Sequence, residues 1–221
     1  MSPPRNALVT GVSRRAGIGY AVARRLLADG VSVFIQGWTA HDEAQPWGAE
    51  PGGTEDVAQE LGLPFVEADF ADPAAPAAAV EAATDALGPL DILVANHARS
   101  GHGRLADLTA GEIDAFLHEN VRASLLLVKE FAARHDDSRD GGRAILLTSG
   151  QHLAPMAREV AYAVSKGALQ QATATLAEEL AGRRITVNTV NPGPTDTGWA
   201  GVANIVGADR QDSTDAEQDQ R

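Results

Sequence analysis

The chain has 221 residues, of which 44% are hydrophobic, and a formal net charge of -12. This length suits one domain with a large buried core, and the acidic charge argues against unassisted binding to nucleic acid or to an anionic membrane. The absence of cysteine excludes disulfides and thiolate chemistry. No segment resembles a signal-peptide core or approaches the roughly 20 apolar residues of a membrane helix. We therefore expect a cytoplasmic protein with no nucleic-acid or membrane partner.

Apolar, strand-like runs alternate with helical patterns along the chain. Strands are expected near 7–10, 31–35, 64–68, 90–94, 144–148 and 185–190. Helices are expected near 18–29, 54–61, 74–87, 110–134 and 161–181. Because the strands are almost continuously apolar, this alternation predicts an α/β fold. It would be a doubly wound, mostly parallel, Rossmann-like sheet of six strands with helices on both faces.

Glycine and polar residues mark the ends of these elements. The segment 38–53 is expected to be a long surface loop, and 134–142 a solvated turn. We expect 1–198 to form a single dinucleotide-binding and catalytic domain and the polar residues 199–221 to form a disordered tail. Left-handed helix C-caps are expected at Gly30, Gly62, Gly88 and Gly182.

A glycine-rich turn, Thr10 to Gly19, follows the first expected strand and opens the first expected helix. Unpaired backbone N–H groups and the helix dipole suit a pyrophosphate at such a position. Gly11 would permit the tight turn, Gly17 would let phosphate approach the backbone, and Gly19 would let the helix pack closely. The glycine pattern alone is weak evidence, and its place after the first strand of an alternating series strengthens it.

The residues around the expected adenosine ribose bear on the choice of cofactor. The end of the second strand, Ile35-Gln-Gly-Trp-Thr39, carries no acid before Asp42, whereas an NAD site places a carboxylate there. Arg14 and Arg15 in the turn offer charge-assisted bonds to a 2′-phosphate. We therefore favour NADP(H) over NAD(H). The alternative is that both arginines are solvated loop residues.

Ser149, Tyr162 and Lys166 form the most informative pattern in the chain. Tyr162 and Lys166 lie four residues apart in an expected helix, so both side chains project from the same face. An ammonium beside a phenol favours the phenolate and lowers the phenol pKa, and such a pair can exchange a proton with an alcohol or ketone. Ser149 follows an expected buried strand at the sheet edge where ligands bind. Tyr-x-x-x-Lys also occurs by chance in many helices.

The six histidines show no paired metal-ligand spacing, so we expect no metal site. We interpret them as surface or loop residues, with His97 and His152 lining a cleft. The substrate pocket is expected around 99–104, around 151–160 and after 194.

Four motifs in order resemble the short-chain dehydrogenase/reductase family over roughly residues 5 to 198. They are the glycine turn, Val94-Ala-Asn96-His-Ala98, Ser149 with Tyr162 and Lys166, and Asn191-Pro-Gly193. The resemblance implies that Tyr162 is the general acid for reduction, that Ser149 holds the carbonyl and that Lys166 binds the nicotinamide ribose and lowers the phenol pKa. It also implies that Asn120 supports a water in the proton relay. It assigns cofactor contacts to Gly11, Ser13, Arg14, Arg15, Gly17, Ile18, Gly19, Trp38, Asp69, Phe70, Asn96, Tyr162, Lys166, Pro192, Gly193, Thr195 and Thr197.

The wide glycine turn and the Trp38-Thr39 pair are similar to those of 3-oxoacyl-[acyl-carrier-protein] reductases. This similarity implies an NADP-dependent oxidoreductase acting on a ketone or secondary alcohol, most like a 3-oxoacyl thioester reductase. Its substrate would be a small carbonyl compound or acyl thioester, and a homodimer would form through the helices near 110–134 and 161–181. Family members usually continue with further helices and a seventh strand. The shortened C-terminus leaves an alternative, which is a truncated, non-catalytic relative that binds nucleotide or a partner.

Overall fold

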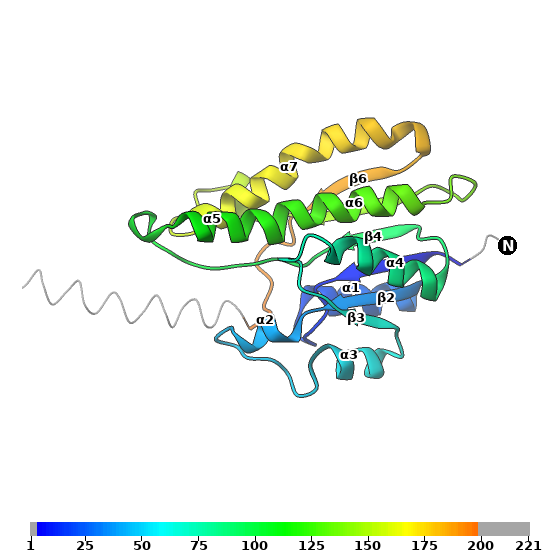
Figure 1. Cartoon of the computed structure of the whole chain (residues 1–221), viewed down its shortest axis with the longest axis horizontal. Coiled ribbons are helices and arrows are strands. Elements are labelled where there is room, and N and C mark those ends of the chain that lie inside the picture. The colour runs from blue at the N-terminus through cyan, green and yellow to red at the C-terminus, as the bar shows by residue number, and fades with distance from the viewer. Residues whose placement is uncertain (1–3, 199–221) are drawn as a thin grey trace, which may run out of the picture.

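The structure, a computed structural model, describes residues 4–198 and contains one sheet of six parallel strands (Figure 1). Its strand order is β3-β2-β1-β4-β5-β6. The predicted α/β class and the predicted six parallel strands are therefore confirmed, whereas the tail predicted for 199–221 lies outside the described residues. The strands are β1 (Asn6–Thr10), β2 (Ser32–Gly37), β3 (Phe65–Glu67), β4 (Ile92–Ala95), β5 (Arg143–Leu147) and β6 (Thr186–Val190).

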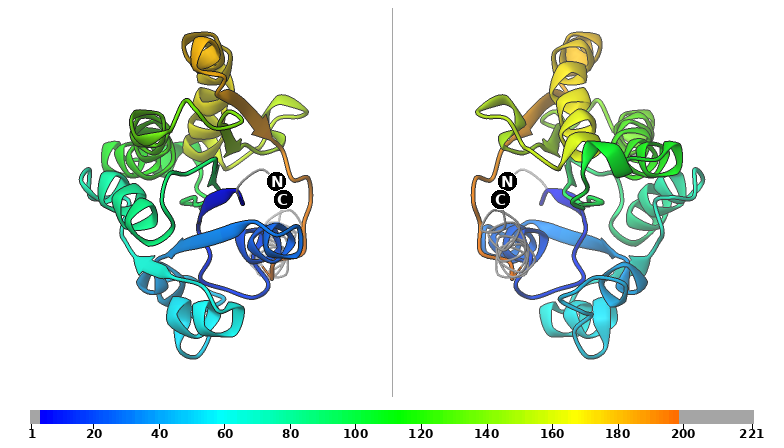
Figure 2. Two further views of the ribbon diagram at one scale, coloured as in Figure 1. Left: turned by 90° about the vertical axis from the view of Figure 1, so that its right-hand side faces the viewer. Right: turned by 90° about the vertical axis from the view of Figure 1, so that its left-hand side faces the viewer.

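Helices cover both faces of the sheet. They are α1 (Ile18–Ala28), α2 (Thr39–Glu43), α3 (Gly53–Leu61), α4 (Ala75–Leu87), α5 (Ala110–Phe116), α6 (Ala123–Arg134) and α7 (Val160–Leu180). Helices α4, α6 and α7 lie on one side, and α1 lies on the other (Figure 2). Along residues 4–198, none of the helices combines the length and apolar character that a membrane span requires.

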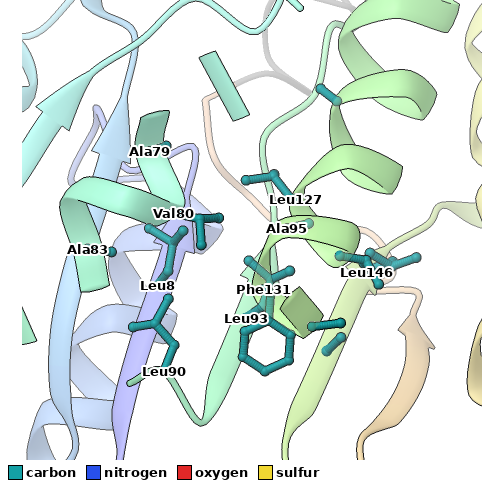
Figure 3. Packing of buried hydrophobic residues seen from close by; sticks show 14 of the residues in the cluster. Leu8, Ala79, Val80, Ala83, Leu90, Leu93, Ala95, Leu127, Phe131 and Leu146 are labelled. Carbon is teal, nitrogen blue, oxygen red and sulfur yellow. The ribbon is translucent and has the colours of Figure 1, made fainter. Parts of the chain in front are cut away.

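The sheet has a separate hydrophobic core on each face because successive strand residues point in opposite directions. Leu8 on β1 is in register with Phe34 on β2 and with Leu93 on β4, and all three belong to the core beneath α4 and α6 (Figure 3). Their neighbours Ala7 and Val9 belong to the core beneath α1 and α3. Burial on both faces explains why the strands are apolar along their whole length.

Several local predictions are wrong. The expected helix 110–134 is helical throughout, as α5, η2 and α6, but its middle part η2 (Leu117–Arg122) has the wider π-helical geometry, which was not predicted. The expected loop 38–53 contains the short helix α2. Gly182 lies inside a 3₁₀ turn, and Arg184 takes the left-handed conformation after it with φ 58°. The other three predicted glycine caps have positive φ.

The segment 134–142, predicted to be a solvated turn, is partly packed against the sheet. Arg139 binds both carboxylate oxygens of the buried Asp91, at 2.6 and 2.7 Å, and Asp91 also accepts from the backbone N–H of Asn6. His135 is buried and contacts the Leu90 carbonyl through Nδ1. These bonds cover the amino ends of β1 and β4. The glycine turn and the other predicted site residues lie at the opposite, carboxyl ends of the strands.

The glycine turn provides a first test of this packing. A Cβ atom on Gly19 would lie 2.5 Å from the Gly11 carbonyl oxygen and 2.8 Å from Asn96 Nδ2, whereas a Cβ on Gly167 in α7 meets nothing within 4 Å. We expect Gly19→Ala to destabilise the fold by roughly 1–3 kcal/mol. Gly167→Ala should stabilise it by about 0.5–1 kcal/mol, because alanine favours a helix. Urea unfolding measures the free energy of unfolding of both variants. Equal changes in the two variants would contradict the close contact at Gly19.

Candidate active site

The glycine turn leaves β1 and lies against the residues that follow β4. Gly11 has φ 71°, and a Cβ there would lie 2.8 Å from the Cα of His97, so only glycine fits. Asn96 donates from Nδ2 to the carbonyls of Thr10 and Gly11, both at 3.1 Å. The predicted cofactor residue Asn96 therefore acts on the turn itself, by holding its carbonyls toward β4.

Gln36 is a positioning residue that the sequence analysis missed. Its Oε1 accepts from the Gly11 N–H at 3.1 Å, and its Nε2 donates to the carbonyls of Gly37 and Ala68. The side chain is 2% exposed and joins the ends of β1, β2 and β3. An amide inside an otherwise apolar strand was the available signal, because a buried polar group requires partners.

Arg14 and Arg15, predicted to bind phosphate, are paired with carboxylates of the chain itself. Arg14 Nε lies 3.3 Å from Asp42, and its guanidinium lies 5.0 Å from the Trp47 ring centre. The Arg14 side chain is 16% exposed, so the alternative of a solvated loop residue is wrong for Arg14. Arg15 binds Glu50 and Glu60 and is more exposed. Ser13 donates from Oγ to the Asp42 carboxylate.

The predicted nicotinamide loop faces the same turn. A hollow of about 520 Å³ separates Gly17 and Ile18 from Pro192 and Thr195. Arg14 Nη1 donates to the Thr197 carbonyl at 3.2 Å and ties the loop to the turn, while Gly193 takes a left-handed conformation. The glycine cradle, the helix N-terminus and the two guanidinium groups fit a phosphate-bearing dinucleotide.

The remaining predicted cofactor residues differ in exposure. Trp38 follows β2 and is 37% exposed. Asp69 is partly exposed, and its side chain accepts from the Ala71 N–H. Phe70 is 5% exposed, with its ring packed edge-on against His97 at 4.5 Å, so its side chain belongs to the core. Only the backbone of Phe70 can then face a cofactor.

Ser149, Tyr162 and Lys166 meet at the carboxyl edge of β5. Ser149 follows that strand, Tyr162 lies in the first turn of α7, and Lys166 lies one turn further along. Lys166 is 2% exposed, donates from Nζ to the Leu147 carbonyl at 2.9 Å, and lies 5.7 Å from the Tyr162 ring centre. The spacing in the sequence therefore places three functional groups around one point.

Burial controls the protonation of this group. Burial raises the pKa of Tyr162, and the Glu159 carboxylate raises it further. A hydrogen bond with Ser149 acts in the opposite direction and is outweighed. The predicted lowering of the phenol pKa by Lys166 is therefore wrong, because desolvation of the phenolate dominates. Burial also lowers the pKa of Lys166 to about 8. At neutral pH the phenol keeps its proton.

Asn120 lies in the π-helix and is fully buried. Its Oδ1 accepts from the Arg99 N–H at 2.7 Å, and its Nδ2 donates to the Arg99 carbonyl and to Ser165 Oγ. Ser165 in turn donates to the Tyr162 carbonyl at 2.7 Å. The amide of Asn120 is thus paired within the protein and fixes the first turn of α7, which carries Tyr162.

His97, which is predicted to line a cleft, is half-buried and lies between the glycine turn and the π-helix. Its Nε2 lies 3.0 Å from the Glu119 carbonyl, which only accepts, so Nε2 carries the proton and the Thr10 hydroxyl donates to Nδ1 at 2.8 Å. Burial, helped by the charge of Lys166, lowers the pKa of His97 to about 3. His97 is therefore neutral and links the glycine turn to the π-helix through two hydrogen bonds.

A smaller hollow of about 110 Å³ adjoins Tyr162. Its walls include the segments 99–105 and 158–162, which are joined by a hydrogen bond from the Gly103 N–H to the Arg158 carbonyl at 2.7 Å. The rest of the lining is Asp107, Leu108, Glu112 and Phe116. Arg158 has φ 71°, an unusual value for a residue with a side chain. Two of the predicted substrate segments therefore meet beside the phenol.

The low pKa of His97 makes stability depend on pH. Below pH 6.5 the unfolded chain binds a proton that the folded chain does not bind until about pH 3, so stability falls as pH falls through that window. We expect a contribution of roughly 1.4 kcal/mol per pH unit. His97→Gln should remove it, so calorimetric melts from pH 7 to pH 5 should fall less steeply for the variant. If the melting temperature fell equally with pH in the variant and in the wild type, a neutral His97 would be excluded.

The sequence matches the short chain dehydrogenase family over residues 5–204. It is 38% identical to the uncharacterized oxidoreductase YjdA of Bacillus subtilis strain 168, covering 90% of this chain and 78% of that protein. It is 35% identical to a monensin polyketide synthase putative ketoacyl reductase of Streptomyces virginiae, covering 90% and 74%. A short chain dehydrogenase from Burkholderia cenocepacia J2315, solved in complex with NADP, is 38% identical with a TM-score of 0.74 and coverages of 87% and 76%. The chain therefore belongs to the short-chain dehydrogenase family of oxidoreductases.

Proposed function

We propose that this enzyme transfers a hydride between NADP(H) and a ketone or secondary alcohol, most like a 3-oxoacyl thioester reductase. The observation that carries the proposal is the convergence of Ser149, Tyr162 and Lys166 beside the glycine turn. The NADP complex of the Burkholderia relative supports the cofactor. The Streptomyces relative, named as a putative ketoacyl reductase, supports the substrate class.

The residues present can perform the proton chemistry of a reduction. Bound NADPH supplies the hydride. Tyr162 donates its proton to the carbonyl oxygen, and its raised pKa keeps that proton in place until the oxygen becomes basic. Ser149 holds the same oxygen through its hydroxyl. Lys166 uses one N–H on the Leu147 carbonyl and has two others for the ribose.

Each part of the glycine-turn edge has a role toward the dinucleotide. Gly11, Ser13, Gly17, Ile18 and Gly19 shape the turn and the helix start that hold the pyrophosphate. Arg14 and Arg15 bind the 2′-phosphate. Trp38, Asp69 and the backbone at Phe70 hold the adenosine end, and Asn96 supports the turn. Contacts to the nicotinamide carboxamide come from Pro192, Gly193, Thr195 and Thr197.

The hollow beside Tyr162 is the proposed carbonyl pocket. Arg104 and Arg158 both line it, whereas Arg99 is paired with Glu119 at 2.8 Å. Neither Arg104 nor Arg158 forms an ion pair with a carboxylate among residues 4–198, although Asp107, Glu112 and Glu159 also line the hollow. Their two guanidinium groups support an acyl group linked to a phosphate-bearing carrier. We place the proton-relay water of the family near Asn120, which holds Tyr162 and the wall at Arg99 in one arrangement.

We also propose a homodimer through the faces of α5, α6 and α7. Val160 and Val164 lie one turn apart on α7 and are 39% and 56% exposed, and Ile113 on α5 is 38% exposed. Apolar side chains spaced in this way support burial against a second copy.

Tyr162→Phe separates catalysis from binding. Because phenylalanine removes only the hydroxyl, we expect turnover of 3-oxoacyl thioesters to fall roughly 10²–10⁴-fold. NADPH affinity, measured by calorimetry, should change little. Full activity in the variant would exclude the assigned acid. Binding of NADPH by the wild-type chain without turnover of any thioester or small ketone would favour the non-catalytic alternative.

Val164→Glu tests the dimer. A carboxylate in an apolar interface loses hydration without a partner, so we expect the variant to sediment as a monomer at concentrations where the wild type is dimeric. Phe65→Glu is a matched control, because Phe65 is 36% exposed on the edge strand β3 at the other end of the sheet. A monomeric wild type, or a dimeric Val164→Glu variant, would contradict the proposed interface.

A further inference from the structure

Glu50 binds Arg15 in the way that a phosphate would. Its Oε1 accepts from the Arg15 backbone N–H at 2.6 Å, and its Oε2 accepts from Arg15 Nη1 at 2.5 Å. One backbone donor in a glycine turn and one guanidinium form a typical anion-binding pair. A carboxylate of the chain itself therefore occupies the donors that Arg15 offers to an anion.

The other carboxylates around the turn have structural partners. Glu60 on α3 accepts from Arg15 Nε and from the Tyr20 hydroxyl, both at 2.5 Å, so it holds the opposite edge of the guanidinium. Asp42 is 5% exposed and binds Ser13, Arg14 and Trp47. Glu60 orients Arg15 and Asp42 anchors the segment after β2.

Glu50 lies on an irregular connection and not in a helix or strand. It falls between α2 and α3, in a stretch where Gly48, Gly52 and Gly53 all have positive φ. Its side chain is 25% exposed, and both of its oxygens bond only to Arg15 among the described contacts. Rotation of this one side chain would free the backbone N–H and Nη1 of Arg15 while Glu60 keeps the guanidinium in place.

We infer that Glu50 competes with the cofactor's 2′-phosphate for Arg15 and thereby limits the preference for NADP(H) over NAD(H). The inference rests on the proposed function. A phosphate monoester carries a charge of about -1.5 to -2 at pH 7. It cannot share these donors with a carboxylate, because like charges at contact distance repel. NADH carries a neutral 2′-hydroxyl and does not require Glu50 to leave.

The test compares variants that each remove one negative charge. Glu50→Gln should bind NADPH roughly threefold more tightly, which is the size of one partly exposed ion pair. Its affinity for NADH should not change. Glu60→Gln removes a charge from the same arginine but also loosens it, so its NADPH affinity should stay equal or fall. Glu55→Gln is the control for net charge, because Glu55 is exposed on α3 and its one hydrogen bond among residues 4–198 is with Gln59.

Calorimetry with 2′,5′-ADP and with ADP isolates the phosphate from the nicotinamide. We expect Glu50→Gln and Glu50→Ala to gain affinity for 2′,5′-ADP alone. If the Glu50, Glu60 and Glu55 variants gained affinity for 2′,5′-ADP equally, the cause would be net charge and the inference would be overturned. Unchanged NADPH binding in both Glu50 variants would overturn it and leave the proposed function standing. A wild-type chain that binds neither NADPH nor NADH would overturn both.

Discussion

The site depends on the close contact between the glycine turn after β1 and the chain that follows β4. Gly11 lies against the backbone of His97, and Gly19 lies against the Gly11 carbonyl and Asn96, at distances that no side chain permits. Asn96 and Gln36 then bind the polar groups of the turn, so its position relative to three strands is fixed. The proposed cofactor binding and the proposed catalysis both depend on this contact.

From the same contact, one line of bonds reaches the proposed catalytic tyrosine. Thr10 donates to His97, His97 donates to the Glu119 carbonyl in the π-helix, and the next residue, Asn120, binds Ser165, which holds the carbonyl of Tyr162. Every group in this line is neutral, so changes of pH near 7 leave it unchanged. The π-helix provides the extra residue that turns Asn120 inward.

Much of this arrangement could be predicted from the sequence. Apolar runs showed where strands lie, and the spacing of Tyr162 and Lys166 showed that both face one point. The wrong predictions concern properties that tertiary packing decides. The lowered pKa of His97, the three bonds of Gln36 and the raised pKa of Tyr162 depend on neighbours far away in the chain. Likewise, no pattern around Arg15 reveals that Glu50 and Glu60 lie beside it.

Burial also shifts the two titratable groups of the free site toward their neutral forms. It raises the pKa of Tyr162 and lowers the pKa of Lys166 to about 8, because both shifts favour the neutral form of the group. At pH 7 the phenol is protonated and most of the ammonium remains charged, which also keeps His97 neutral. A protonated phenol beside a single positive charge can stabilise an alkoxide that forms on hydride addition. The protonation state of the free site therefore agrees with the proposed role of Tyr162 as the general acid.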